Sequence, residues 1–128
     1  MKKIKVSCAI IEIDDKTLVV QRNKNMSLAF KWEFPGGKIE NGESDVECVL
    51  REIKEELNIK IRIISRLTPS NYHYPEHTVL LIPFLCRYVG GNICLSEHKE
   101  YKLLSKDKLI NLDWSAADIP VLNEYLGQ

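Results

Sequence analysis

The 128-residue sequence has no excess of charge of either sign, because 18 lysines and arginines balance 18 aspartates and glutamates. A protein that coats a nucleic-acid polymer normally carries a basic excess, so the balance argues against such a partner. A small anionic substrate held by local charges or by a metal is still compatible with it. We therefore expect a small-molecule partner and no nucleic-acid polymer.

Long apolar runs are also missing. A membrane-spanning helix needs about 18 or more consecutive apolar residues, and no such run is present. The first residues, Met-Lys-Lys-Ile-Lys-Val, lead into an acidic position at Glu12, without the apolar core and cleavage site of a secretory signal. We expect no membrane association and a cytoplasmic location.

Closely spaced cysteine pairs are absent as well. The four cysteines are Cys8, Cys48, Cys86 and Cys94, and none forms the C-x-x-C pair typical of a zinc site. In a cytoplasmic protein they are expected to be reduced and to act as small hydrophobic residues.

Repeats, low-complexity segments and linkers are missing too, and 45% of the residues are hydrophobic. This length and composition suit one compact domain over residues 1–128. We expect a monomer or a weak dimer.

Runs of β-branched residues, separated by turn residues, predict strands at 4–13, 17–21, 31–34, 59–67, 78–89 and 101–104. The run 78–89 is almost continuously apolar, which predicts a central strand. Pro35-Gly36-Gly37 is expected to end the third strand. Helical patterns cover 44–57, 105–109 and 116–126, with Pro120 in the first turn of the last one. The mixture predicts an α/β fold in which helices cover a sheet.

The helix at 44–57 has clear ends. Ser44 and Glu47 have the spacing of a capping box, and Asn58 can adopt the left-handed conformation that closes a helix. Its apolar face is predicted from residues that recur at helical spacing, namely Val46, Leu50, Ile53 and Leu57.

Three glutamates on this helix share one side. Glu52, Glu55 and Glu56 stand at i, i+3 and i+4, within a sector of roughly 100°. They repel one another and lie in the C-terminal half of the helix, where its dipole disfavours anions. A hard divalent cation would reverse that penalty. The alternative is a solvated acidic face balanced by nearby lysines and arginines.

The wider spacing resembles the Nudix hydrolase family. The Nudix box is a glycine, five residues, a glutamate, seven residues and then Arg-Glu-U-x-Glu-Glu-x-Gly-U, where U is bulky and aliphatic. Eight of its nine specified positions are present, and Asn58 replaces the last glycine. Because asparagine tolerates the left-handed conformation, the turn should survive. The matching residues are Gly37, Glu43, Arg51, Glu52, Ile53, Glu55, Glu56 and Ile59.

Segments outside the box resemble the MutT-type branch, which includes enzymes that remove oxidised dGTP and similar CTP pyrophosphohydrolases. These segments are Gln21-Arg22, residues 32–40 and residues 117–120. The resemblance implies the Nudix fold, an α/β/α sandwich around a mixed β-sheet. It also implies that Mg²⁺ or Mn²⁺ supports the hydrolysis of a nucleoside triphosphate, with oxidised dGTP, CTP or a modified dCTP as substrate, to a monophosphate and pyrophosphate.

The resemblance also implies roles for the acidic residues. Glu52, Glu55 and Glu56 would bind the metal, together with the backbone carbonyl of Gly37. An acid from a later loop would join them, and Glu97 matches that position best. Glu100 is the alternative. One of the carboxylates would act as general base.

Basic residues near the box have two expected functions. Arg51 would pair with Glu43, Glu47 or Glu55 and orient the carboxylates, a part that Glu43 shares. Arg22 and Lys38 would contact phosphate, the alternative being ordinary surface cations. The branch often has a second arginine after Arg22, and Asn23 stands there instead.

Asp118 lies where MutT-type proteins read the edge of the base. An ionised aspartate accepts hydrogen bonds, which suits the amino group of cytosine or guanine. The alternative is a helix-start acid. Phe34 is expected to contact the base, and further aromatic candidates are Trp32, Tyr72 and Tyr74. The alternative is that these aromatic side chains belong to the core, as aromatics near strands often do. Three histidines lack metal-ligand spacing and are predicted at the surface, namely His73, His77 and His98.

Two other functions are compatible with these residues. One is a non-catalytic domain that senses nucleotides, although such domains usually have a damaged glutamate set. The other is a Nudix hydrolase of a different nucleoside-diphosphate-linked substrate, such as ADP-ribose or a dinucleoside polyphosphate. The chain is short for the extra elements that many of those enzymes have.

Overall fold

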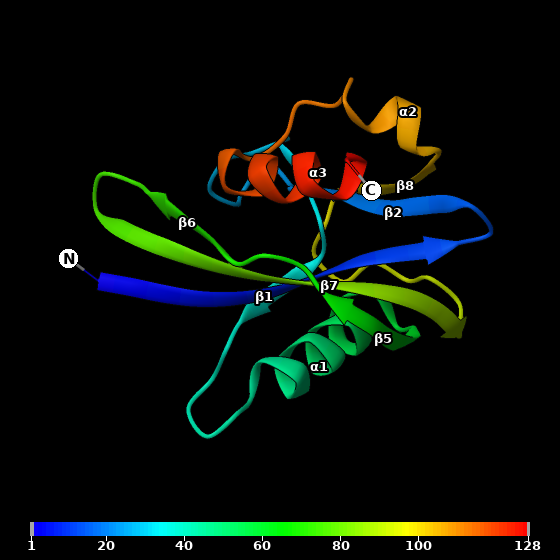
Figure 1. The fold of residues 1–128 in the computed structure, drawn as a ribbon, viewed down its shortest axis with the longest axis horizontal. Helices are drawn as coiled ribbons and strands as arrows, with labels where there is room; N and C mark the ends of the chain where they lie inside the picture. Colours follow the sequence, from blue (N-terminus) through cyan, green and yellow to red (C-terminus); the bar gives the residue numbers. More distant parts are fainter. Residues whose placement is uncertain (1, 128) are drawn as a thin grey trace.

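The computed structural model describes residues 2–127, which form one mixed sheet with helices on both faces (Figure 1). The strands are β1 (Lys2–Ile13), β2 (Lys16–Gln21), β3 (Trp32–Glu33), β4 (Gly36–Lys38), β5 (Lys60–Arg66), β6 (Ser70–His73), β7 (His77–Gly90) and β8 (Glu100–Leu104). The helices are α1 (Asp45–Leu57), α2 (Lys106–Leu109), a 3₁₀ turn (Ala116–Asp118) and α3 (Ile119–Leu126).

The two longest strands, β1 and β7, lie side by side and parallel at the centre of the sheet. The sheet has the order β3-β2-β1-β7-β5, and its other pairs are antiparallel. The short strands β4, β6 and β8 add to β1, β7 and β2 respectively. This mixture of parallel and antiparallel pairs confirms the predicted α/β class.

Each face of the sheet has its own core. Alternate residues of β1 point to opposite faces, as the two-residue period of a strand requires. Ala9 and Ile11 pack under α1, and Cys8 and Ile10 pack under α3. Figure 1 shows α1 on one side of the sheet and α2 and α3 on the other. The arrangement is therefore the expected α/β/α sandwich.

Helix α1 begins and ends as its sequence predicts. The Ser44 side chain accepts a hydrogen bond from the Glu47 amide, and the Glu47 side chain accepts one from the Ser44 amide. Asn58 closes the helix in the left-handed conformation, with φ 60° and ψ 33°. The local chemistry of both ends is sufficient to define this helix.

The predicted apolar face of α1 was wrong at one position. Leu50 is 41% exposed, whereas Val49 is fully buried in the core with Ile53 and Leu57. Val46 is partly buried against the same cluster. The sequence offers valine and leucine at adjacent positions, and the orientation of the helix on the sheet selects the valine.

Gly36 and Gly37 form a strand, where the sequence predicted an end to a strand. They are part of β4 and pair with Cys8 and Ser7 of β1. A Cβ atom on Gly36 would lie 2.0 Å from the Ser7 carbonyl oxygen, so only glycine allows this approach. Strand β6 was also missed, since its polar sequence Ser-Asn-Tyr-His has no strand pattern and depends on pairing with β7.

Candidate active site

The three predicted metal-binding glutamates of α1 occupy different environments. Glu52 has a side chain that is only 16% exposed, whereas the side chain of Glu55 is 59% exposed. Glu56 is largely buried, and its Oε1 atom has no hydrogen-bond partner among residues 2–127. A buried carboxylate oxygen without a protein partner is costly, and a bound cation would offset that cost.

Gly37 allows Glu52 to lie against the backbone of β4. A Cβ atom at Gly37 would meet the Glu52 carboxylate carbon and one of its oxygens at 2.3 Å. The space that a side chain would fill is therefore occupied by a carboxylate. The Cys48 thiol of α1 also lies close to β4, 3.4 Å from the carbonyl oxygens of Gly37 and Lys38.

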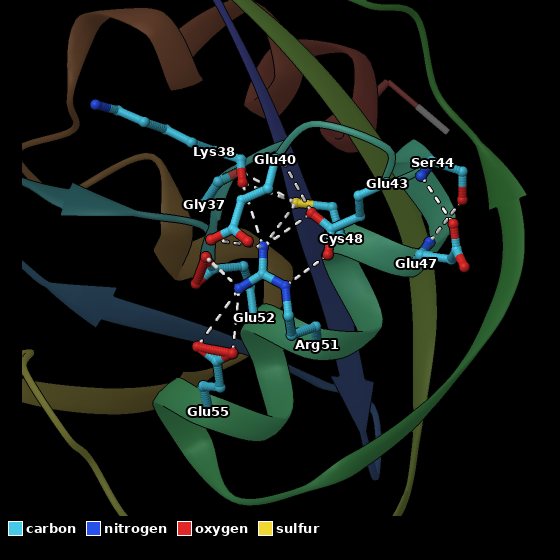
Figure 2. A network of polar contacts seen from close by, with 10 residues as sticks. All are labelled: Gly37, Lys38, Glu40, Glu43, Ser44, Glu47, Cys48, Arg51, Glu52 and Glu55. Carbon is cyan, nitrogen blue, oxygen red and sulfur yellow. Dashed lines mark hydrogen bonds and ion pairs between the residues drawn. The ribbon is translucent and has the colours of Figure 1, made fainter.

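Arg51 is the centre of an ion-pair network that orients these carboxylates (Figure 2). Its Nε and Nη2 donate to the two oxygens of Glu43 at 2.6 and 2.9 Å. Its Nη1 reaches Glu52 and Glu55, each at 3.2 Å. Of the three predicted partners it has Glu43 and Glu55, while Glu47 belongs to the helix cap. The hydrogen bonds that Glu43 accepts from Arg51, and next the one from the Glu40 amide, lower the pKa of Glu43 to about 2.

The Glu56 carboxyl group is difficult to ionise. Burial, together with the charges of Glu52, Glu33 and Glu97, raises its pKa to about 8, although one hydrogen bond from the Gly36 amide opposes the shift. Burial also raises the pKa of Glu52, although Arg51 opposes that shift. A cation placed among these groups would offset the repulsion that raises both values.

The donor atoms fit a hard divalent cation such as Mg²⁺, which prefers oxygen ligands. The unpartnered oxygen of Glu56 and the position of Glu52 against Gly37 support this fit. Within residues 2–127, however, no three His, Cys, Asp or Glu side chains already converge as a metal cluster. Glu55 in particular is directed to Arg51, so it would have to turn to become a ligand.

Of the two later acids, Glu97 lies near the α1 carboxylates. Its charge is among those that raise the pKa of Glu56, and the neighbouring Ser96 amide donates to the Glu56 carbonyl oxygen at 3.2 Å. Glu100 is the first residue of β8, where it pairs in register with Gln21 and forms a 3.7 Å ion pair with Lys99. The geometry therefore favours Glu97.

A cavity of about 350 Å³ adjoins the Gly36–Gly37 strand. Its walls are mainly apolar and include Val6, Val79 and Leu81. The structure brings together at this cavity all the residues that the sequence predicted for substrate binding, namely Arg22, Phe34, Lys38 and Asp118. Tyr74 and His77 also line it, whereas Trp32 and Tyr72 do not.

Asp118 is buried at the base of α3, and its Oδ2 accepts a hydrogen bond from the Phe34 amide at 2.9 Å. Burial, followed by the charge of Glu33, raises the pKa of Asp118 well above its usual value. We predicted an ionised acceptor, whereas burial favours the neutral acid, which can also donate a hydrogen bond.

Sequence reasoning missed Glu33 and placed His98 wrongly. Glu33 accepts from Arg22 Nη1 at 2.9 Å through one oxygen, and its other oxygen lies 2.9 Å from His98 Nε2. His98 was predicted at the surface, but its side chain is only 1% exposed. The two partners are 65 residues apart in the sequence, so no local pattern signals their contact. The Arg22 guanidinium also donates to the carbonyl oxygen and the hydroxyl of Ser27.

Comparison with known proteins agrees with this architecture and site. The NUDIX domain model matches residues 1–125. The CTP pyrophosphohydrolase of Escherichia coli is 31% identical over 127 residues, covering 99% of this chain and 94% of that protein. The 8-oxo-dGTP diphosphatase of the same organism is 34% identical over 125 residues, covering 97% of this chain and 93% of that protein.

Solved structures show the same likeness. The MutT protein of Methanosarcina mazei has a TM-score of 0.87 and 30% identity, and the match covers 98% of this chain and 94% of that one. The MutT protein of methicillin-resistant Staphylococcus aureus has a TM-score of 0.81 and 37% identity, covering 99% of this chain and 98% of that one.

The chain has the architecture of Nudix-fold proteins, a mixed sheet between helices in which the helix that carries the glutamates packs against the glycines of β4. The chain belongs to the NUDIX family and is a hydrolase of phosphoric anhydride bonds. This confirms the family inferred from the box. Among residues 2–127, no helix is both long enough and apolar enough to cross a membrane.

Proposed function

We propose that this protein is a nucleoside triphosphate pyrophosphohydrolase that requires Mg²⁺ or Mn²⁺. It would cleave oxidised dGTP, CTP or a modified dCTP to the nucleoside monophosphate and pyrophosphate. The observation that carries the proposal is that the cavity containing Asp118 is also lined by Gly37, against which the Glu52 carboxylate of α1 lies. A base in the cavity would place its phosphates at the acidic groups of α1.

The metal ligands would come from α1, β4 and the loop before β8. Glu52 lies against Gly37, the charges of Glu52 and Glu97 act on Glu56, and Glu55 would join after it leaves Arg51. When bound, the metal would neutralise phosphate charge and activate water.

The protein's own groups would complete the reaction. Arg51 and Glu43 hold the carboxylates in position. Arg22 and Lys38, at the cavity wall, would contact phosphate. A carboxylate of α1, or Glu97, would accept a proton from the attacking water. Phe34 and Asp118 would contact the base, and a neutral Asp118 would offer it both a donor and an acceptor.

We also propose that residues 1–128 act as a single domain, as a monomer or weak dimer in the cytoplasm. The NUDIX model spans almost all of the chain. The four cysteines are free and three of them are buried, which suits a reducing compartment.

A pyrophosphate-release assay tests the proposed activity. The panel comprises CTP, dCTP, 5-methyl-dCTP, 8-oxo-dGTP, dGTP and ATP, each with Mg²⁺ and with EDTA, and Glu56→Gln is the inactive control. ADP-ribose is tested in parallel by the release of AMP, because its cleavage yields ribose 5-phosphate and no pyrophosphate. We expect at least one triphosphate to yield monophosphate and pyrophosphate in equal amounts. The relatives named above act on CTP and 8-oxo-dGTP.

Other results would point to the alternatives. Tight nucleotide binding by calorimetry without turnover would indicate a sensing domain. Turnover of ADP-ribose alone would indicate a different Nudix substrate class. The ADP-ribose pyrophosphatase of Methanocaldococcus jannaschii is 38% identical over 88 residues, although the match covers only 50% of that protein.

A further inference from the structure

The loop that carries Glu97 is attached to the protein on both sides of that residue. Before it, the Cys94 and Ser96 amides donate to the carbonyl oxygens of Leu57 and Glu56 at 3.0 and 3.2 Å. After it, the Lys99 amide donates to the Gln21 carbonyl oxygen at 2.9 Å. The loop therefore runs from the end of α1 to the end of β2, and Glu97 lies between these attachments.

His98 adds a side-chain attachment at the same point. Its Nε2 lies 2.9 Å from Glu33 Oε2, and the ring is almost completely buried. The other oxygen of Glu33 accepts from Arg22 at 2.9 Å. The backbone oxygen of Glu97 itself accepts from the Asn23 side chain at 2.6 Å. Glu33 is the side-chain partner of this buried ring, and separating the two would leave the buried Nε2 without a hydrogen bond, so the His98–Glu33 contact fixes the loop.

Glu33 connects three parts of the site. It lines the cavity, pairs with Arg22 on the cavity wall, and pairs with His98 in the loop before β8. Because His98 directly follows Glu97, a fixed imidazole ring restricts where the Glu97 carboxylate can lie. No other role in the proposed reaction uses the buried His98 ring.

We propose that His98 is a positioning residue, which through its contact with Glu33 holds the loop so that Glu97 stays near the carboxylates of α1. The catalytic part of this inference rests on the proposed function. Its structural part, the placement of the loop by the His98 ring, does not.

Matched substitutions of His98 separate the hydrogen bond from the bulk of the ring. His98→Phe keeps a ring of similar size without nitrogen, and His98→Gln places an amide nitrogen near the position of Nε2. For His98→Phe we expect kcat to fall about 10-fold or more, with KM changed less than about 3-fold. His98→Gln should keep kcat within about 3-fold of the wild type, because it retains a donor to Glu33.

Two further measurements report on the loop itself. Hydrogen exchange at the Ser96 and Lys99 amides should become faster in His98→Phe but not in His98→Gln, while amides inside α1 keep their protection. The Mg²⁺ concentration for half-maximal binding should rise in His98→Phe only. His73→Phe is the matched control, since His73 has a similar hydrogen bond to Thr78 at 2.9 Å and lies on β6, outside the proposed machinery.

A double-mutant cycle tests the route through Glu97. In a Glu97→Gln background, His98→Phe should lower kcat less than about 2-fold, because the group it positions is already disabled. An unchanged loss in that background would overturn the proposal, as would a failure of His98→Gln to restore kcat and amide protection. If His98→Phe does not fold, His98→Asn replaces it, since its amide is too short to reach Glu33.

Failure of the proposed function gives a different result. If the wild type hydrolyses no nucleotide, hydrogen exchange and Mg²⁺ binding still report on the loop. If His98→Phe is folded and its Ser96 and Lys99 amides exchange at the wild-type rate, that result alone would show that the His98 ring does not place the loop.

Discussion

Glu56 shows how a single residue can be arranged for chemistry at the expense of stability. Its neutral form is favoured in the folded protein because burial and three nearby carboxylates disfavour the charge. The unfolded chain has no such environment, so its Glu56 ionises near pH 4.5. Without metal, ionisation of Glu56 therefore destabilises the folded state as pH rises from about 4.5 towards about 8.

Replacement of Glu56 by glutamine should remove both the activity and this penalty. We expect kcat to fall at least about 100-fold, since a metal ligand or base is lost. In EDTA, the variant should gain stability relative to the wild type between pH 5 and pH 8, by about 1.4 kcal/mol for each pKa unit of the shift. Urea unfolding at several pH values measures the difference. If the free energy of unfolding of the wild type instead rose relative to that of the variant over this pH range, the inferred environment of Glu56 would be wrong.

Asp118 offers a second prediction at the residue scale. Asp118→Asn keeps an oxygen for the Phe34 amide, which accounts for the 2.9 Å hydrogen bond, so the fold should persist. It changes the donors and acceptors that face a base. We expect the ratio of kcat/KM between two nucleotides of the panel to change by about 10-fold, or about 1.4 kcal/mol. An equal loss for every nucleotide would exclude a role in reading the base.

At the scale of elements, the site depends on how closely α1 approaches β4. Neighbouring glycines of β4 serve different purposes. A Cβ atom on Gly36 would meet backbone atoms of Ser7 and Cys8, at 2.0 and 2.6 Å, whereas one on Gly37 would meet the side chain of Glu52 at 2.3 Å. Backbone cannot move aside without disturbing the sheet, but a carboxylate can.

The two alanine variants should therefore fail in different ways. Gly36→Ala should lower the free energy of unfolding by about 3 kcal/mol or more, or prevent folding, because it forces β4 away from β1. Gly37→Ala should unfold close to the wild type but bind Mg²⁺ at least about 10-fold more weakly, since Glu52 is displaced. Thermal unfolding and Mg²⁺ titration distinguish them, and each variant is the control for the other. Equal destabilisation by both would show that the approach at Gly37 is structural only.

At the scale of the whole molecule, the site is assembled from distant segments. The cavity takes residues from β1, β3, β4, β7 and the 3₁₀ turn before α3, and the acids come from α1 and the loop before β8. This constellation exists only in the folded chain. A ligand that requires it binds the native state alone and must stabilise it.

Mg²⁺ should accordingly raise the melting temperature. At ten times its dissociation constant, the ion should add about 1.4 kcal/mol to the free energy of unfolding. Glu52→Gln and Glu56→Gln should lose most of this gain, and EDTA should reverse it in the wild type. Calorimetry with KCl at equal ionic strength controls for screening, and an equal rise with KCl would argue against a specific site.

Much of the active helix could be predicted from sequence. The capping box at Ser44 and Glu47 and the left-handed turn at Asn58 were confirmed, because each depends on residues a few positions apart. The spacing of the glutamates also placed them on one side of α1. The roles inferred for Arg22, Lys38 and Asp118 stay predictions, although the structure brings all three to one cavity.

The family, the ends of α1 and the array of carboxylates follow from the order of the amino acids alone, since covalent spacing and the helical repeat settle which of these groups are neighbours. Packing in three dimensions was needed to show that Leu50 faces outward, that β4 is a strand, that Asp118 favours its neutral form and that His98 is buried on Glu33. Burial and partner choice depend on groups far apart in the chain. The free energies of burial and of these contacts arise only when the sheet and its helices pack together.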